Sequence, residues 1–459
     1  MGFSPEQFDF RFSDSDNVEF GRVSDWIAEG KKLIAVYGEA GTGKSTFIRE
    51  LTAYCKGRQI NIQCVAFTGK AAGNIEGRTL HSFFGFEIRP YLPTERIFEH
   101  PTAAQLMAQG KELTGTRVLD DGRSVPYFRW TLDMYFRSRL SELENLDVLV
   151  VDEVSMVRCD LLDTADIILR KAKGKDQPFG GITVLLVGDK RQLPPVASGS
   201  DGAVLADYYN TPFSYLESDV IRRSELREVL LDTVYRQKDP GFIALLRGVR
   251  LNGLMPGDIE TLNTRLVPSV KFEHLPVEHQ IICCTNRRVD HYNHHMLDLI
   301  QSDEFIYTAE VSPGFPSSEY PTNPQLRLKL GAKVMFLRND RAGVYYNGTV
   351  GQVRALFDDR VVVEVRGQEV VVTRERWTST VYEHHKDKRS VDAVGRTEDF
   401  VQIPLRLAWA MTTHKAQGQT FDNILCDLSD EFTTEHAYVT LSRCRSLEGI
   451  TLLSKLERQ

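Results

Sequence analysis

The chain has 459 residues, of which 42% are hydrophobic and 26% are charged, and it contains 33 Gly and 18 Pro. This length exceeds what one hydrophobic core usually serves, and the composition is that of a globular protein, so a single small module and a disordered chain are both excluded. The formal net charge of −7 excludes a surface that binds nucleic acid over its whole extent, so any polyanion site must be local.

The cysteines and the apolar runs indicate the compartment. Seven cysteines occur without a CxxC spacing and without a secretory leader, which predicts reduced thiols in a cytosol-type compartment. The longest apolar stretches, near residues 146–151 and 182–187, are far shorter than the roughly 18 residues of a membrane span. We therefore expect a cytoplasmic protein, nucleoid-associated if the cell is bacterial, without a membrane segment.

Short continuous apolar runs bounded by Gly or acidic residues predict strands that are buried on both faces. In chain order these runs are residues 33–37, 64–67, 148–151, 184–187 and 281–284. Helical patterns follow Lys44 and cover residues 161–171. Because buried strands alternate with helices, we predict an α/β fold with parallel sheets and crossover connections.

Two segments interrupt this alternation. Residues 87–145 contain several Pro and Gly residues and no long period, which is typical of an inserted subdomain or a long loop. Residues 326–377 contain short β-type runs separated by turns, and they predict a small all-β insert. Its expected strands are residues 333–337, 349–356, 360–365 and 369–373. Asn347-Gly348-Thr349 also fits a glycosylation sequon, but without an export signal we interpret it as a hairpin turn.

A phosphate-binding motif follows the first predicted strand. The string GEAGTGKS at residues 38–45 fits G-x-x-x-x-G-K-[ST] and leads into a helical pattern. In such a loop backbone N–H groups wrap the phosphates, Lys44 reaches the β and γ oxygens, and the Ser45 hydroxyl ligates Mg²⁺. The alternative is an ordinary glycine-rich turn, which the flanking strand and helix disfavour. The expected nucleotide contacts are Gly38, Gly41, Thr42, Gly43, Lys44, Ser45 and Thr46.

An acidic pair ends the third predicted strand. We expect Asp152 to hold the Mg²⁺ shell and Glu153 to polarise the attacking water, because hydrolysis needs one group on the metal and another on the nucleophile. Such a pair is a weak signal alone. Together with the phosphate-binding motif it predicts a site that hydrolyses a nucleoside triphosphate.

Three further side chains are candidates for the same site. Gln192 follows the next predicted strand, and we interpret it as a sensor of the γ-phosphate; the alternative is a surface turn that two prolines end. Arg236 and Arg443 each lie beside apolar residues, and arginines there can stabilise the charge of a transferring phosphoryl group. Their alternative is a buried salt bridge.

Motifs follow one another in a fixed order along nearly the whole chain. They are GEAGTGKS (38–45), AFTGKAA (66–72), TLHSFFG (79–85), VDEVSM (151–156), PFGG (178–181), GDKRQLPP (188–195), VYRQKDP (234–240), AMTTHKAQGQT (410–420) and YVTLSRCRSLEG (438–449). This set resembles superfamily-1 helicases of the PIF type, with RecD and Dda as more distant relatives. The VSM and PFGG strings point to the PIF branch.

The resemblance implies two RecA-like lobes that close on ATP and Mg²⁺. Lobe 1A would comprise residues 1–85 and 140–215, and lobe 2A residues 216–300 and 400–459. Residues 86–139 would form an inserted wedge, subdomain 1B, and residues 301–399 an inserted β-barrel-like subdomain 2B. The first lobe would contribute Lys44, Ser45, Asp152, Glu153 and Gln192 to the ATP site, and the second lobe Arg236, Gly418 and Arg443.

The resemblance also places single-stranded DNA across the tops of both lobes. The implied contacts are Thr68, Lys70, His81 and Phe83 in the first lobe and Thr413, His414 and Lys415 in the second. Hydroxyls, amides and Lys bind phosphates, while an aromatic ring stacks on a base. The alternatives are packing beneath the sheet for His81 and Phe83, and an interior histidine for His414.

The implied function is an ATP-dependent DNA helicase that moves 5′ to 3′ on single-stranded DNA and opens single-strand/duplex junctions, as a monomer in solution. Binding to DNA should weaken with salt. Three alternatives stay open: a translocase that does not separate strands, an RNA-directed helicase, and a binding module with an inactive ATP site. The sequence leaves open whether a forked duplex, a G-quadruplex or an RNA–DNA hybrid is preferred.

Overall fold

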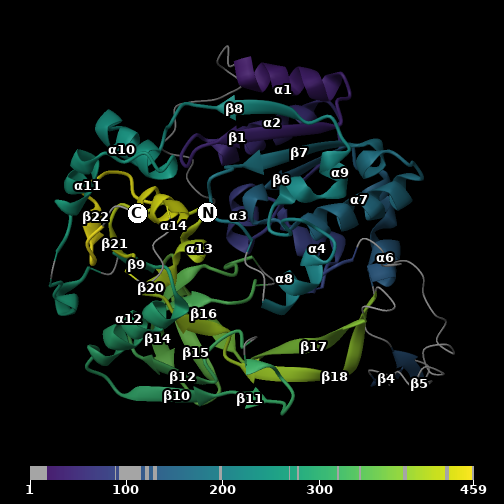
Figure 1. The fold of residues 1–459 in the computed structure, drawn as a ribbon. Helices are drawn as coiled ribbons and strands as arrows, with labels where there is room; N and C mark the ends of the chain where they lie inside the picture. The colour runs from purple at the N-terminus through teal and green to yellow at the C-terminus, as the bar shows by residue number, and fades with distance from the viewer. Residues whose placement is uncertain are drawn as a thin grey trace.

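The structure is a computed structural model. It describes residues 18–87, 89–92, 115–118, 124–127, 132–195, 199–267, 269–276, 279–317, 320–340, 343–385, 390–429 and 434–456. Two α/β lobes face one another, and an all-β part lies below them (Figure 1). Among the described helices, none has the length and apolarity that crossing a membrane requires. Much of the predicted insert at residues 86–139 lies outside the described residues.

The first lobe is built on a six-stranded parallel sheet in the order β3-β2-β6-β7-β1-β8. Its strands are β1 (Leu33–Gly38), β2 (Ile62–Ala66), β3 (Arg78–Thr79), β6 (Val148–Asp152), β7 (Thr183–Gly188) and β8 (Arg227–Leu231). β1, β6 and β7 are buried along their whole length, which confirms the strands expected from continuous apolar runs. The carboxyl ends of these strands meet at one edge of the sheet.

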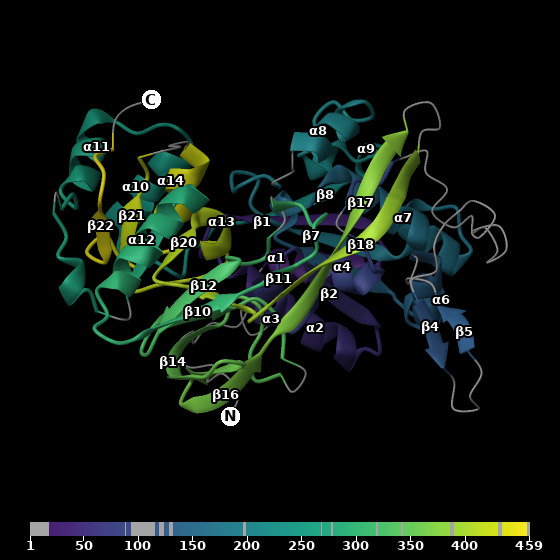
Figure 2. The ribbon, with the colours of Figure 1, turned by 90° about the horizontal axis from the view of Figure 1, so that it is seen from below.

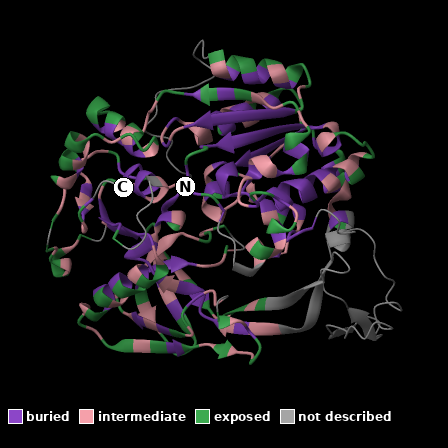
Figure 3. Ribbon diagram, in the orientation of Figure 1, coloured by how far each residue is buried: buried purple, intermediate pink, exposed green. Residues whose placement is uncertain are grey.

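Helices cover both faces of this sheet. They are α1 (Val18–Ala28), α2 (Lys44–Gly57), α3 (Gly69–Asn74), α4 (Leu80–Phe84), α6 (Leu132–Glu144), α7 (Cys159–Lys173), α8 (Gly199–Ala206) and α9 (Asp219–Arg222), with 3₁₀ turns η1 (Val154–Met156), η2 (Pro178–Gly181) and η3 (Tyr215–Glu217). Alternate residues of β1 enter two cores: Leu33 and Ala35 pack toward α4, α6 and α7, and Ile34 and Val36 toward α1, α2 and α3. In Figure 3 the strands are buried and the outer helix faces are exposed.

The second lobe has a four-stranded parallel sheet in the order β20-β9-β21-β22. Its strands are β9 (Gln280–Cys283), β20 (Ala410–Thr412), β21 (Ile424–Asp427) and β22 (Ile450–Leu452), and its helices are α10 (Pro240–Arg250), α11 (Pro256–Asn263), α12 (Asn286–Asp298), α13 (Thr413–Ala416) and α14 (Thr434–Leu441), with the 3₁₀ turn η4 (Phe272–His274). One core cluster joins β9 and α12 to the all-β part, so these two parts share a hydrophobic core.

The all-β part contains a five-stranded antiparallel sheet and a long hairpin. Its strands are β10 (Glu304–Thr308), β11 (Glu310–Val311), β12 (Gln325–Lys329), β13 (Lys333–Phe336), β14 (Val350–Leu356), β15 (Arg360–Val365), β16 (Gln368–Thr373), β17 (Glu375–His385), β18 (Ser390–Gln402) and β19 (Leu405–Leu407). The four predicted strands are confirmed within one residue at each end. Gly348 has φ 92° between β13 and β14, as the predicted turn requires.

The sheets correct three expected boundaries. β8 pairs with β1, so the first lobe extends past residue 215; the apolar run of β8 is only three residues, 229–231, which is too short to predict a strand. α6 contributes Phe136 and Leu143 to the first core, so this lobe resumes before residue 140. β19 pairs with β13, so the all-β part extends beyond residue 399.

The hairpin of β17 and β18 was not predicted from the sequence. The two strands pair antiparallel from Glu375 opposite Gln402 to His385 opposite Ser390. Figure 1 and Figure 2 both show it extending from the all-β part toward the first lobe. The all-β part is therefore larger than the short strands alone indicated.

Candidate active site

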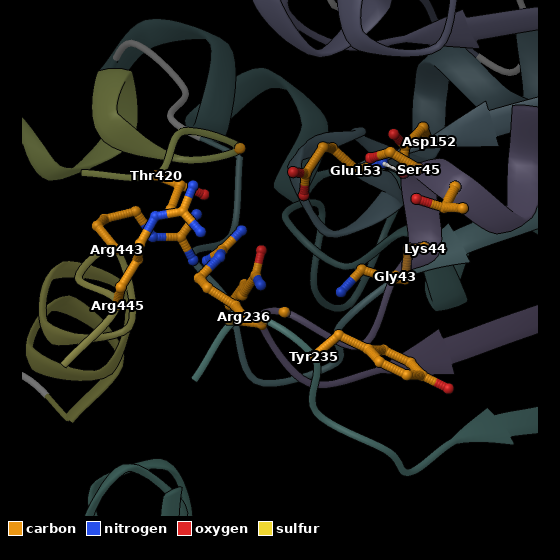
Figure 4. Close-up of a pocket in the computed structure, with 15 residues that line it drawn as sticks. Gly43, Lys44, Ser45, Asp152, Glu153, Tyr235, Arg236, Thr420, Arg443 and Arg445 are labelled. Atoms are coloured by element: carbon orange, nitrogen blue, oxygen red, sulfur yellow. Dashed lines mark hydrogen bonds between the residues drawn. The ribbon is translucent and has the colours of Figure 1, made fainter. Parts of the chain in front are cut away.

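A cavity lies between the two lobes at the carboxyl edge of the first sheet. Figure 4 shows Ser45, Asp152 and Glu153 on one side of it and three arginines opposite. It is lined by Ala40, Gly41, Gly43, Lys44, Ser45, Thr46, Asp152, Glu153, Gln192, Tyr235, Arg236, Gly418, Thr420, Arg443 and Arg445. The structure therefore brings together, from both lobes, nearly all the residues predicted for the nucleotide site.

The loop before α2 owes its shape to small residues. Gly41 and Gly43 have φ 87° and 81°, a region that favours glycine, and a Cβ on Gly41 would lie 2.6 Å from the Cβ of Arg236. Gly38 and Thr42 do not line the cavity. A Cβ on Gly38 would lie 2.3 Å from Thr42 Oγ1, so these two residues shape the loop from beneath.

Lys44 is held by the loop itself. Its Nζ donates to the carbonyl oxygens of Gly38 at 2.8 Å and Glu39 at 2.9 Å. Desolvation lowers the pKa of Lys44, while the carboxylates of Asp189, Glu153 and Asp152 oppose that shift. The ammonium thus lies at the centre of the loop among three acidic groups.

The two carboxylates of the acidic pair are buried close together, where their negative charges repel each other. Asp152 and Glu153 are 3% and 9% exposed, and Asp152 Oδ1 accepts the Glu153 N–H at 2.9 Å. Burial, and next the charge of Glu153, raise the pKa of Asp152 to about 7. Glu153 has φ 52°, a conformation that costs a non-glycine residue about 1–3 kcal/mol and is found often at functional sites. A divalent cation bound here would relieve this repulsion, and a carboxylate with the Ser45 hydroxyl is an oxygen donor set that suits Mg²⁺.

Arg236 and Arg443 are the cations opposite this pair. Arg236 Nη1 donates to the Ser442 carbonyl at 2.9 Å, and Arg443 donates to the Val439 carbonyl at 2.8 Å and to Ser442 Oγ at 2.9 Å. Neither guanidinium forms an ion pair with a carboxylate of the described residues, so the buried salt bridge is wrong there. Desolvation and the neighbouring Arg443 lower the pKa of Arg236 to about 9, and desolvation lowers that of Arg443. A buried and a half-buried cation, both without a carboxylate partner among the described residues, fit an anionic ligand.

The backbone around Arg236 touches both lobes. The N–H groups of Tyr235 and Arg236 donate to the Gly41 carbonyl at 2.8 and 3.3 Å. The next side chain, Gln237, donates through Nε2 to the Cys444 carbonyl at 2.7 Å. The segment between β8 and α10 is therefore fixed over the phosphate-binding loop.

Gln192 lies inside the site and not on a surface turn. It is 6% exposed and lines the cavity. Its Oε1 accepts from Gln417 Nε2 at 3.1 Å, and the same nitrogen donates to Glu153 Oε2 at 2.9 Å. Sequence reasoning missed Gln417, although the HKAQGQT string places it directly before Gly418, a predicted contact.

Charged contacts between the lobes, here called the interlobe clamp, surround the phosphate-binding loop. Arg250 on α10 contacts Asp189 at 2.8 Å and Glu39 at 3.7 Å, and Arg247 contacts Glu39 at 3.0 Å. Tyr438 on α14 donates to Asp189 Oδ2 at 3.1 Å and accepts the Ala40 N–H at 2.8 Å. These contacts join residues that are far apart in the sequence, and no motif predicted them.

An Arg250→Met substitution is expected to raise the KM for ATP about three- to tenfold, a shift of about 1 kcal/mol in lobe closure. The side chain of Asp189 is 0% exposed and that of Arg250 is 16% exposed. In the closed arrangement, removing Arg250 therefore leaves the buried carboxylate of Asp189 without its cation, which disfavours lobe closure. Arg247→Met is the matched control, because the Arg247 side chain is 45% exposed and exposed pairs contribute little. Equal KM values for the two variants would contradict the clamp. Steady-state ATP hydrolysis measures both.

The first-lobe residues predicted to contact DNA divide into two groups. Thr68 caps α3 and accepts the Ala71 N–H at 3.2 Å, and Lys70 lies on the same helix with its pKa lowered by burial. His81 packs edge-on against Phe67 and Phe86, and burial lowers its pKa to about 4. Phe83 is 1% exposed in the first core. The expected stacking of Phe83 on a base is therefore wrong, because both faces of its ring are covered by protein.

The second-lobe residues lie on α13. Thr413 is 0% exposed, and its hydroxyl is engaged by the Cys283 carbonyl at 3.2 Å and Thr440 Oγ1 at 3.0 Å. The hydroxyl is therefore occupied within the protein, which leaves the backbone of Thr413 for the predicted contact with DNA. His414 packs edge-on against His436, and burial lowers its pKa to about 4, which fits the interior alternative. Lys415 is exposed at the helix surface.

Comparisons with known proteins agree with this site. A model described as AAA domain matches residues 27–198. The chain is 30% identical over 441 residues to the ATP-dependent DNA helicase Pif1 of Bdellovibrio bacteriovorus, covering 94% of this chain and 85% of that protein. It is 30% identical over 424 residues to the human ATP-dependent DNA helicase PIF1, covering 91% of this chain and 57% of that protein. The chain is also 28% identical to the ATP-dependent DNA helicase Pif1 of Psychrobacter sp. This match covers 93% of the present chain and 66% of that protein.

Solved structures show the same likeness over the whole fold. A Bacteroides Pif1 helicase in complex with ADP-AlF3 and ssDNA matches with a TM-score of 0.77 and 31% identity, covering 96% of this chain and 92% of that one. Unliganded Pif1 from Bacteroides matches over the same shares at 31% identity with a TM-score of 0.59. The Pif1 helicase of Candida albicans matches with a TM-score of 0.69 and 26% identity, covering 97% of this chain and 95% of that one.

Proposed function

The chain belongs to the Pif1 family of helicases, and we propose that it is an ATP-dependent DNA helicase that moves 5′ to 3′ along single-stranded DNA and opens duplexes. The observation that carries this proposal is the cavity between the lobes, where the buried Arg443 and the half-buried Arg236, neither with a carboxylate partner among the described residues, face a buried acidic pair. That arrangement fits a triphosphate with its metal ion. Relatives of this chain are named ATP-dependent DNA helicases.

In this proposal each side chain of the cavity has one role. Lys44 and the loop N–H groups bind the phosphates, and Ser45 and Asp152 hold Mg²⁺, which when bound neutralises charge on the β and γ oxygens. Glu153 accepts the proton of the attacking water. Gln192 donates to the γ-phosphate, and Gly418 lies against it. Arg236 and Arg443 stabilise the charge that develops during transfer.

Lobe closure couples this chemistry to movement. The likeness is greater to the Bacteroides structures with ssDNA, at TM-scores of 0.77 with ADP-AlF3 and 0.76 without it, than to the complex with ADP-AlF4, at 0.61, or to the unliganded protein, at 0.59. This supports an arrangement of the present structure like that of the relative with single-stranded DNA. ATP binding closes the lobes and hydrolysis reopens them, so that alternate grip on the strand advances the protein.

The proposal extends to the parts of the molecule. In it the two lobes are RecA-like, the first extending through β8 at residue 231, and the all-β part is the barrel-like subdomain 2B. The insert predicted at residues 86–139, up to the start of α6, provides the wedge, 1B, that meets single-strand/duplex junctions. The protein acts as a monomer in the cytoplasm, nucleoid-associated if the cell is bacterial. Thr68, Lys70 and Lys415 contact the strand, the Thr413 backbone supports it, and His81 and His414 support these contacts from within the two lobes.

Binding of single-stranded DNA is expected to take up protons near pH 7.5. Desolvation, and next the guanidinium of Arg406, lower the pKa of Lys415 to about 7, although the side chain is exposed. A DNA phosphate would favour the ammonium and raise this pKa again. Because the bound state then holds more protons, the affinity for DNA should fall as pH rises above 7. The expected proton uptake is at most about one proton per complex.

Calorimetric titration with oligo-dT in two buffers of different ionisation enthalpy measures this uptake. Lys415→Ala should abolish the difference between the buffers. Lys455→Ala should preserve it, because Lys455 is an exposed lysine elsewhere in the second lobe. Identical heats for the unaltered protein in the two buffers would refute the assignment of Lys415.

The test of the function is unwinding of a fluorescent partial duplex that carries either a 5′ or a 3′ single-stranded tail, with ATP and Mg²⁺. We expect unwinding of the 5′-tailed substrate alone, and its loss in Lys44→Ala. ATP hydrolysis stimulated by single-stranded DNA without unwinding would instead identify a translocase. Stimulation by RNA in preference to DNA would identify an RNA-directed helicase.

A further inference from the structure

Gln417 bridges the two lobes at the residues that act on water and on the γ-phosphate. It is 5% exposed and caps the carboxyl end of α13 in the second lobe. Its Nε2 donates to Glu153 Oε2 at 2.9 Å and to Gln192 Oε1 at 3.1 Å, both in the first lobe. One amide nitrogen therefore holds two side chains that come from different strands.

The chemistry of the partners fixes the orientation of these amides. An ionised carboxylate only accepts hydrogen bonds, so Gln417 must turn its nitrogen, and not its oxygen, toward Glu153. The second N–H of Gln417 then donates a hydrogen bond to Oε1 of Gln192. The NH₂ group of Gln192, at the other end of the same planar amide, is not used by this contact, and Gln192 lines the cavity. Gln417 thereby sets Gln192 to donate toward a bound phosphate.

This arrangement is not explained by stability alone. The Oε1 of Gln417 is buried and has no hydrogen-bond partner among the described residues. An unsatisfied buried acceptor costs free energy. An apolar side chain of similar size would avoid that cost, so the amide is better explained by the two contacts that its nitrogen makes.

The same residue is joined to the proposed DNA contacts. α13 has only four residues, Thr413–Ala416, and Lys415 lies two positions before Gln417. The Gln417 N–H donates to the His414 carbonyl at 3.3 Å, and Thr412 Oγ1 accepts the Lys415 N–H at 3.4 Å. A displacement of this turn by a phosphate on Lys415 must therefore move the Gln417 side chain as well.

We propose that Gln417 is a positioning residue that orients Glu153 and Gln192 across the lobe interface, so that ATP hydrolysis depends on the strand held by α13. This inference rests on the proposed function of the site. It predicts that substitution of this one side chain, which contacts neither nucleotide nor DNA, uncouples ATP hydrolysis from DNA binding.

The first experiment compares Gln417→Ala with Gln419→Ala. Gln419 is the matched control, because its Nε2 donates to the Lys415 carbonyl at 2.6 Å and contacts no first-lobe residue among those described. We expect Gln417→Ala to lower the kcat stimulated by oligo-dT at least tenfold, to lower the ratio of stimulated to basal rate, and to change the KM for ATP and the Kd for oligo-dT less than threefold. Gln419→Ala should keep the stimulated kcat within threefold. A loss in Gln417→Ala that appears in KM or Kd, or no loss, would overturn the proposal.

The second experiment measures the basal kcat, without DNA, of Gln417→Glu and Gln417→Asn. A carboxylate at this position repels the charge of Glu153 and cannot donate the two hydrogen bonds of the amide, so Gln417→Glu should lower the basal kcat at least tenfold, and Gln417→Asn, which keeps the amide, should lower it less. An unchanged basal kcat in Gln417→Glu would overturn the positioning role. A protein that hydrolyses ATP without stimulation by DNA would refute the proposed function, and the basal rate would still test the contact with Glu153.

Discussion

An Arg236→Ala substitution is expected to lower the kcat of ATP hydrolysis about 10³-fold or more, the range seen when an arginine that stabilises phosphoryl transfer is removed. The side chain is half-buried, and its guanidinium donates to the carbonyl of Ser442 and forms no ion pair with a carboxylate of the described residues, so its charge can meet an anion. The loop carbonyl of Gly41 holds its backbone over the phosphate site. Phosphate release in the presence of oligo-dT measures the loss.

The control for this prediction is Arg445→Ala. Arg445 lines the same cavity, but its side chain is 45% exposed and pairs with Asp422 at 2.9 Å. We expect its removal to change kcat less than about tenfold, because an exposed pair contributes little. Arg236→Lys should restore little activity, since an ammonium cannot reproduce the planar fork of donors. Comparable losses in Arg236→Ala and Arg445→Ala would show that position 236 has no special role.

A Glu153→Gln substitution is expected to lower kcat by about 10² to 10⁴, the usual contribution of a general base. The amide has nearly the same shape, and its oxygen can still accept from Gln417, which donates to Glu153 Oε2 at 2.9 Å. Folding and ATP binding should therefore persist. Single-turnover hydrolysis, with the affinity for a fluorescent ATP analogue measured alongside, separates the chemical step from binding.

Glu39→Gln provides the same chemical change beside the same loop. Glu39 contacts Arg247 at 3.0 Å and does not line the cavity. We expect this variant to change the KM for ATP through the interlobe clamp and to keep kcat within about tenfold, as a partly exposed ion pair implies. If Glu153→Gln weakened ATP binding and left the chemical step intact, its assignment as the base would be refuted.

The sequence by itself determined the chemistry of the first lobe. Lys44, Asp152 and Gln192 lie in the segments that follow three strands predicted by continuous apolar runs, and the carboxyl ends of parallel strands lie together. Their approach to one another therefore follows from local pattern and from the parallel arrangement. The motif order was also readable, because each motif is a short string whose residues are neighbours in the chain.

Only the tertiary structure decided which side chains face the site and which distant residues meet. Phe83 and Thr413 lie in motifs typical of DNA contacts, yet both are buried, because the direction of a side chain depends on the elements packed against it. β8 is an edge strand whose sequence, REVLL, neither alternates nor holds a long apolar run, so the sequence does not distinguish it from a loop. Gln417 meets Glu153 across 264 positions, and Arg247 meets Glu39 across 208. Such contacts arise from the closure of two lobes, and no local pattern of residues encodes the distance between them.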